Sequence, residues 1–196
     1  MASSAYCTLV TSNEYSAGAL VLGHTLRQHG TSRLLACMVT PGLDAEVVRR
    51  LHNVFHHLHF VDPLDSLDVA ALALLGRPEL GVTLTKLQLW RLTQYDKVVF
   101  LDADTFPLRN VDELFEREEF SAAADIGWPD CFNSGVFVCR PSLRTYHALM
   151  QTMSNHGSFD GGDQGVLNTH FSSWSTGDSS RRLPFIYNVT PSAWYR

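Results

Sequence analysis

The sequence predicts an α/β fold in which helices flank a mainly parallel sheet. Short apolar runs alternate with segments whose apolar residues recur at helical spacing, which is the pattern of strand–helix–strand units. Residues 97–101, Lys-Val-Val-Phe-Leu, are almost entirely apolar, as expected for a parallel strand covered on both faces. The 196 residues include 45% hydrophobic side chains and no Ser/Gly/Pro linker, charge block or repeat, so we expect one domain over residues 1–196.

The first half of the chain predicts strand, helix, strand, helix in that order. Residues 5–10 form an apolar run, and residues 11–13, Thr-Ser-Asn, are of the types that cap helices. The helix that follows carries its apolar residues on one face and ends at Gly30. The later elements expected in this half are a strand at 34–39, a helix over 47–55 and strands at 58–61 and 97–101.

The second half is less regular but contains one clear helix. Pro141 and Ser142 open this helix and Gly157 closes it. Its apolar stripe is expected to consist of Leu143, Tyr146, Met150 and Met153. Two strands are expected before it, at 120–124 and 134–139.

Composition and charge exclude several classes of function. The net charge of −5 provides no basic surface for a polyanion, so nucleic acid is not an expected partner. No apolar run approaches the roughly 20 residues of a membrane span, and residues 1–6 lack the features of a signal peptide. The four widely spaced cysteines match no metal or disulfide pattern and are expected to be reduced thiols. We therefore expect a cytoplasmic protein with no membrane partner.

The common phosphate-binding loops are missing after the first expected strand. No Gly-x-Gly-x-x-Gly is found there, and the spacing from Gly18 to Gly23 is followed by His24 instead of the lysine of a phosphate loop. Dinucleotide dehydrogenases and phosphate-loop NTPases are therefore disfavoured.

Asp102 and Asp104 directly follow the most apolar strand, at the sheet edge where parallel sheets bind ligands. In extended backbone, positions two apart point to the same side, so both carboxylates are expected to face one spot. Two charges about 6 Å apart would repel by roughly 3 kcal/mol at an effective dielectric near 20, but by well under 1 kcal/mol in open water. A half-buried pair would need a cation such as Mg²⁺ or Mn²⁺, whereas a solvated turn would need none, and both interpretations remain open.

Three other polar groups have a ligand-binding and a plain structural interpretation. Residues 160–165, Asp-Gly-Gly-Asp-Gln-Gly, could approach a ligand closely or could simply begin a helix. Residues 133–135, Asn-Ser-Gly, could bind sugar hydroxyls or form an ordinary turn. Lys86 could neutralise a phosphate or lie on the solvated face of an amphipathic helix. The histidines at 56, 57 and 59 fit no closed metal site and are expected at the surface.

Several long stretches resemble the glycogenin family, the self-glucosylating glycosyltransferases of family 8. These stretches are residues 18–23, 77–87, 100–105, 127–136 and 157–165. The resemblance implies a GT-A fold with a Rossmann-like nucleotide-binding half. It also implies retaining transfer of glucose from UDP-glucose with Mn²⁺ as cofactor, a cytoplasmic location and a homodimer.

The resemblance also implies a role for individual residues. Asp102 and Asp104 would hold Mn²⁺, which stabilises the leaving diphosphate. The donor-binding set would comprise Leu9, Thr11, Tyr15, Arg77, Lys86, Asp102, Ala103, Asp104, Asn133, Ser134, Asp160, Asp163 and Gln164. The catalytic set would comprise Asp163, Lys86 and the acceptor Tyr195. Asp163 would lie nearest the reacting carbon, either attacking the sugar or stabilising an oxocarbenium-like transition state.

Departures from the family pattern raise a second hypothesis. The family continues to a segment His-x-x-Gly-x-x-Lys-Pro-Trp that supplies a third metal ligand, and further on to a segment that docks glycogen synthase; this sequence ends at Arg196, before either. Ser12 and Gln88 also replace residues of the family pattern. The alternative to an active enzyme is a catalytically impaired short form that serves as acceptor or dimerisation partner of an active glycogenin.

Overall fold

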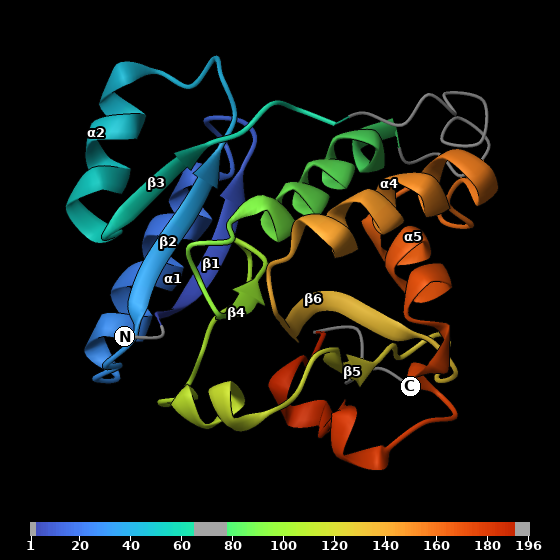
Figure 1. Ribbon diagram of the computed structural model, residues 1–196. Helices are drawn as coiled ribbons and strands as arrows, with labels where there is room; N and C mark the ends of the chain where they lie inside the picture. The colour runs from blue at the N-terminus through green and yellow to red at the C-terminus, as the bar shows by residue number, and fades with distance from the viewer. Residues whose placement is uncertain (1–2, 65–77, 191–196) are drawn as a thin grey trace.

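The computed structural model describes residues 3–64 and 78–190 and contains one seven-stranded sheet (Figure 1). The strands lie in the order β3-β2-β1-β4-β6-β5-β7. Strand β6 is antiparallel to both of its neighbours, and the other pairs are parallel. The expected α/β fold with a mainly parallel sheet is confirmed. The strands are β1 (Ser4–Val10), β2 (Leu34–Val39), β3 (His57–Phe60), β4 (Lys97–Leu101), β5 (Ser121–Ala124), β6 (Phe132–Cys139) and β7 (Arg182–Leu183).

Helices cover both faces of this sheet. One face packs against α1 (Ser16–Gln28), α2 (Ala45–Val54) and the 3-10 helix η2 (Asp112–Glu116). The other face packs against the 3-10 helix η1 (Pro78–Arg91), α4 (Leu143–His156) and α5 (Asp163–His170), which lie side by side in green and orange in Figure 1. Three single-turn 3-10 helices complete the described part: η3 (Ser172–Trp174), η4 (Ser179–Arg181) and η5 (Phe185–Tyr187).

The alternation of strand side chains produces two separate cores. Cys7 and Phe100 point toward the layer of η1, α4 and α5, whereas Tyr6 and Val99 point toward α1, α2 and η2. Both faces of β4 are buried, which agrees with the four consecutive apolar residues 98–101 that follow Lys97.

The expected strands agree with the observed ones to within two residues, and the helix signals are mostly confirmed. Gly30 and Gly157 have positive φ angles of 72° and 65° at helix ends, where glycine costs least. Ser142 caps α4 by accepting a hydrogen bond from the Thr145 amide at 3.4 Å. The expected cap at residues 11–13 is wrong: α1 begins at Ser16, whose amide and hydroxyl both donate to the Asn13 carbonyl.

The amphipathic helix expected around Lys86 is also wrong. Residues 84–90 are all buried, because η1 packs against the sheet and against both α4 and α5. A segment that is covered on every side has no solvated face. The interpretation of Lys86 as a surface lysine is therefore excluded.

Two smaller expectations concern membranes and cysteines. In residues 3–64 and 78–190, none of the helices combines the length and apolar character needed to cross a bilayer. The four cysteines are not in disulfides, and Cys7, Cys37 and Cys139 are buried in the sheet.

Asp112 of η2 is hydrogen-bonded to β1 and to the loop between α1 and β2, and its ionisation makes the stability of the fold dependent on pH. Its carboxylate accepts hydrogen bonds from Tyr6 Oη at 2.9 Å and Thr31 Oγ1 at 2.6 Å, and from the amide and hydroxyl of Ser32. Burial alone would raise the pKa of Asp112, but these donors outweigh it and lower the pKa. The ionised carboxylate therefore stabilises the fold at neutral pH, and this contribution is lost as pH falls below the ordinary value near 4.

We expect Asp112→Asn to lower the free energy of unfolding by about 1.5–3 kcal/mol at pH 7, because hydrogen bonds to a charged acceptor are lost. The difference between wild type and variant should shrink as pH is lowered from 5 toward 3. Urea unfolding at several pH values measures it. A difference that stays constant over this range would contradict the assigned ionisation.

Candidate active site

A cleft of about 470 Å³ opens at the sheet edge where β1 and β4 end and β6 begins. Parallel sheets place their ligands at this edge. Every described residue that the sequence predicts for the site lines this cleft, whereas Arg77 and Tyr195 lie outside the described residues. The lining consists of Leu9, Thr11, Tyr15, Thr83, Lys86, Asp102, Ala103, Asp104, Asp125, Asn133, Ser134, Gly135, Asp160, Gly162, Asp163 and Gln164.

The two aspartates after β4 reach the cleft through a turn and not through extended backbone. The strand ends at Leu101, and the Asp102 carbonyl then accepts hydrogen bonds from the amide and hydroxyl of Thr105 at 3.0 and 2.7 Å. The expectation that Asp102 and Asp104 share a face because of strand alternation is therefore wrong. The Asp102 amide donates to the Gly135 carbonyl at 2.8 Å, which fixes the turn to β6, and both carboxylates still line the cleft.

Lys86 is the central cation of the cleft. Its ammonium nitrogen lies 2.8 Å from Asp163 Oδ2 and 3.0 Å from Asp102 Oδ1, and it donates to the Ser134 carbonyl at 3.2 Å. The side chain is only 5% exposed. Burial lowers the pKa of Lys86, but the two carboxylates outweigh it and the pKa is raised above its ordinary value. Lys86 therefore stays charged and links the end of β4 to the start of α5.

Asp102 is more exposed to solvent than Lys86 and Asp163, with 36% of its side chain accessible. Burial raises its pKa, Lys86 opposes the shift, and repulsion from Asp163 and Asp104 raises it further, to about 6. The described lining residues include five aspartates and one lysine, so this part of the cleft carries excess negative charge. An added cation would relieve that repulsion.

Asp163 is the first residue of α5 and is held from two sides. Its amide donates to Thr83 Oγ1 at 3.1 Å, and its carboxylate meets Lys86. The side chain is 7% exposed. The carboxylate therefore lies between the Lys86 ammonium and the first turn of α5, where negative side chains interact favourably with the helix dipole.

Asp160 has the structural role that the sequence left open. Its Oδ1 accepts hydrogen bonds from Ser158 Oγ at 2.6 Å and from the amides of Gly162 at 3.0 Å and Gly165 at 2.9 Å. These bonds fold the turn before α5 and satisfy amides at its start. Asp160 nevertheless lines the cleft, so the turn presents it to a ligand as well.

Asp125 is a site residue that the sequence analysis missed. Its Oδ1 accepts from the amides of Gly127 and Trp128. Its Oδ2 accepts from Asn133 Nδ2 at 3.0 Å and Gln164 Nε2 at 3.2 Å. These donors outweigh burial and lower the pKa of Asp125. Asp125 directly follows β5, which runs in the same direction as β4, so the rule that singles out Asp102 could have found it.

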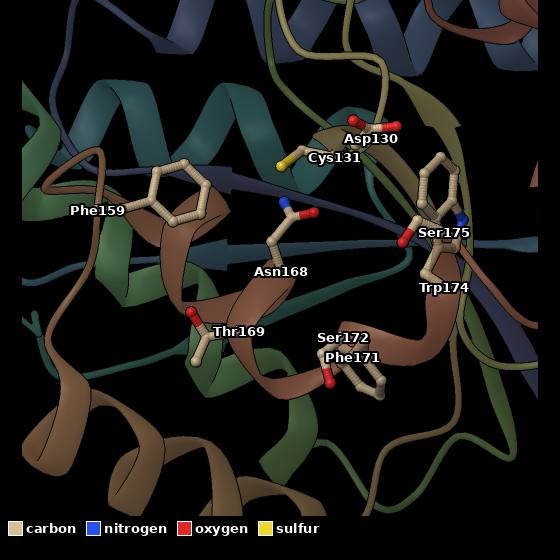
Figure 2. Close-up of a pocket in the computed structure, with 9 residues that line it drawn as sticks. All are labelled: Asp130, Cys131, Phe159, Asn168, Thr169, Phe171, Ser172, Trp174 and Ser175. Atoms are coloured by element: carbon tan, nitrogen blue, oxygen red, sulfur yellow. The ribbon is translucent and has the colours of Figure 1, made fainter.

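A second, smaller pocket of about 170 Å³ is lined by Asp130 and Cys131, which precede β6, and mostly by residues of α5 and the segment after it (Figure 2). Phe159 lies at one end of this pocket in the view and Trp174 at the other, with Asn168 between them. Asn168 is engaged by Phe132 and Gln164 through 2.9–3.0 Å hydrogen bonds. None of the residues predicted for the site lines this pocket, so the larger cleft is the candidate active site.

Comparisons with known proteins identify the family of the chain. The family model described as "Glycosyl transferase family 8" matches residues 6–195 of this chain. Glycogenin-1 from Oryctolagus cuniculus is 57% identical over 195 residues, covering 100% of this chain and 59% of the relative, and human Glycogenin-1 is 56% identical, covering 100% and 56%. The chain thus spans less than two thirds of the length of these relatives.

Solved structures with low sequence identity share the fold. The glycosyltransferase GlyE of Streptococcus pneumoniae TIGR4 matches 100% of this chain and 48% of its own with a TM-score of 0.64 at 18% identity. An active-site mutant of LgtC matches 85% of this chain and 70% of its own with a TM-score of 0.63 at 16% identity. These neighbours confirm the GT-A fold that the resemblance implies. The family match over residues 6–195 establishes that this chain belongs to glycosyl transferase family 8.

Proposed function

We propose that the protein is a glycogenin-type retaining glucosyltransferase that uses UDP-glucose and Mn²⁺ to glucosylate Tyr195 and so prime glycogen synthesis. The observation that carries this proposal is the buried cluster in which Lys86 bridges Asp102 and Asp163 inside the cleft. It is supported by family membership and by relatives named glycogenin.

The cleft suits a nucleotide-sugar donor in size and lining. Its volume of about 470 Å³ falls in the ordinary range for small-molecule sites. Leu9, Thr11 and Tyr15 at the end of β1 are the proposed contacts of the uracil and ribose, and the Tyr15 ring is half exposed there. Arg77 and Lys86 are the proposed contacts of the diphosphate and sugar.

The residues at the end of β4 fit a hard divalent cation. Carboxylate oxygens are the ligands that Mg²⁺ and Mn²⁺ prefer, and the excess of carboxylates over lysine favours a bound cation. Asp102 and Asp104 would hold it, with Ala103 between them. In residues 3–64 and 78–190 no group of three or more His, Cys, Asp or Glu is arranged for a metal, so the donor diphosphate and water are the proposed further ligands. When bound, the cation supplies Lewis-acid stabilisation of the leaving diphosphate.

The other wall of the cleft is proposed to hold the glucose. Asn133, Ser134, Asp160 and Gln164 present amide, hydroxyl and carboxylate groups to it. In the transfer, the bond between glucose C1 and the UDP phosphate oxygen breaks and its electron pair leaves with UDP. The Tyr195 phenolic oxygen bonds to C1, and its proton passes to the leaving phosphate oxygen or a base.

Asp163 is proposed to face C1 during this exchange. Lys86 holds its carboxylate in place at 2.8 Å. In a retaining transfer, Asp163 would either attack C1 directly or stabilise positive charge on the sugar. In both roles Lys86 would balance the charge of Asp163 while the carboxylate stays in the cleft.

The partners follow from the same proposal. We propose that two copies pair and that the protein works in the cytoplasm, consistent with four cysteines outside disulfides. The acceptor-only alternative is not favoured, because Lys86, Asp102 and Asp163 are all present and in contact.

Tyr195→Phe tests the acceptor. After incubation with UDP-glucose and Mn²⁺, the intact mass of the wild-type chain should increase by whole hexoses, and the variant should gain none because it lacks the accepting oxygen. Release of UDP by hydrolysis should persist in the variant, since the donor site is unchanged.

Tyr146→Phe on α4, which removes a phenol outside the cleft lining, is the matched control and should add hexoses normally. Hexoses on the Tyr195→Phe chain would contradict the acceptor assignment. Absence of both hexose addition and UDP release in the wild type would contradict the enzymatic proposal.

A further inference from the structure

The last described segment of the chain is bonded to the sugar-binding wall of the cleft. Asn188 Nδ2 donates to Asn133 Oδ1 at 2.7 Å, across 55 positions of sequence. Neither the family stretches nor the spacing of polar residues in the sequence indicates this contact. Asn188 directly follows η5 and precedes the residues that lead to Tyr195.

The partner of Asn188 is itself held firmly. Asn133 Oδ1 also accepts from the Gly135 amide at 2.9 Å, and Asn133 Nδ2 donates to Asp125 Oδ2 at 3.0 Å. Asp125 in turn binds Gln164. Because both ends of the Asn133 amide are engaged, its orientation is fixed even without Asn188. The contact therefore positions Asn188 and not Asn133.

Close packing at Gly135 supports a built contact. A Cβ atom at this position would lie 3.0 Å from Asn133 Oδ1 and 3.4 Å from both Nδ2 and Oδ1 of Asn188. The two amides therefore close directly over the glycine. This approach requires the absence of a side chain at residue 135.

The rest of the segment is weakly buried. Phe185 is 41%, Ile186 69% and Val189 47% exposed. Tyr187 donates from its hydroxyl to Glu113 of η2 at 2.9 Å, and neither residue lines the cleft. Asn188 therefore supplies a directed link from this segment to the cleft.

We propose that Asn188 is a positioning residue that tethers the acceptor-bearing end of the chain to the donor site. The inference rests on the proposed transfer to Tyr195. Tyr195 lies seven positions after Asn188 in the sequence, so an extended chain reaches at most about 25 Å from the tether. Anchoring Asn188 at the cleft wall raises the effective concentration of the phenol near a cleft, in this copy or in a paired one.

The test separates acceptor positioning from donor binding. Asn188→Asp keeps the size of the side chain but replaces the donor by an acceptor, and Asn188→Ala removes it. In both variants we expect the first-order rate of the first hexose addition, followed by intact mass, to fall about five- to tenfold, the cost of one hydrogen bond. UDP release by hydrolysis, measured in a Tyr195→Phe background, and UDP affinity should stay within twofold of wild type.

Asn110→Ala is the matched control, since it removes a long-range amide bond, to the His29 carbonyl, outside the cleft lining. Equal losses in self-transfer and UDP release would overturn the tether by showing that Asn188 acts on the donor site. An unchanged first addition would overturn it as well.

Hydrogen exchange provides an arm that does not depend on activity. Amides of residues 184–190 should exchange faster in Asn188→Ala than in wild type or Asn110→Ala, and unchanged exchange would overturn the tether. A wild-type chain that neither adds hexose nor releases UDP would instead overturn the proposed function, while the exchange result would still decide the contact.

Discussion

Replacing Lys86 by methionine is expected to produce the largest combined loss of stability and activity. The change leaves Asp102 and Asp163 facing each other in a largely buried cluster without their shared cation. Breaking a buried ion pair on one side typically costs about 3–5 kcal/mol of unfolding free energy. Loss of one preorganised charge at a reacting centre should also lower the transfer rate by about 10²–10³.

The pH dependence of this loss follows from Asp102. The pKa of Asp102 is already raised to about 6, so Asp102 takes up a proton as the pH falls. Protonation removes the repulsion between Asp102 and Asp163, which the uncharged methionine side chain cannot balance. The stability difference between wild type and Lys86→Met should therefore be smaller at pH 5 than at pH 8. Thermal and urea unfolding at the two pH values measure it.

Lys97→Met is the matched control for burial of a lysine. Lys97 is also buried, but it donates to the carbonyls of Phe115 and Arg117 and does not line the cleft. It should lose about 1–3 kcal/mol because two acceptors are left unsatisfied, with unchanged transfer per folded molecule. Equal activity losses in the two variants would contradict the assignment of Lys86 to the site.

The location of the site was predictable because it depends on local sequence. The apolar run of β4 identifies a central strand, and the residues after such a strand lie at the ligand-binding edge whatever the rest of the fold does. Asp102, Asp104 and the residues at the end of β1 follow from this rule. The succession of strands along the chain and the boundaries of β4 are encoded by short local patterns, so the structure agrees with the prediction from the sequence.

The environment of Lys86 was not predictable because it depends on distant segments. Helical spacing indicates which residues share a face, but it assumes that another face meets water. Here α4 and α5, which follow about 60 residues later in the chain, cover η1. The hydrogen bond from Gln164 to Asp125 and the one from Asn188 to Asn133 likewise join residues that lie 39 and 55 positions apart in the sequence. Contacts of this kind depend on packing and leave no periodic signal.

Gly18→Ala should displace the turn that carries Asp102 and Asp104, because α1 packs directly against this turn. Gly18 lies in the first turn of α1, and a Cβ there would overlap the Ala103 carbonyl oxygen and lie 3.1 Å from its carbonyl carbon. The better helix propensity of alanine, worth up to about 1 kcal/mol, cannot offset this overlap, because the obstacle is backbone. Overpacking typically costs about 1–3 kcal/mol.

The effect on function should exceed the effect on stability, because the displaced backbone carries Asp102 and Asp104. A shift of about 1 Å in a catalytic group can cost about 100-fold in rate, so we expect transfer to fall by that order and Mn²⁺-dependent UDP affinity to weaken. Gly23→Ala is the control: it overpacks the same helix against the Val54 and Phe55 side chains, outside the cleft lining. Calorimetry of UDP binding, paired with thermal unfolding, distinguishes the two. If both variants lose stability but bind UDP as tightly as wild type, close packing of α1 against the Asp102–Asp104 turn does not set the geometry of the site.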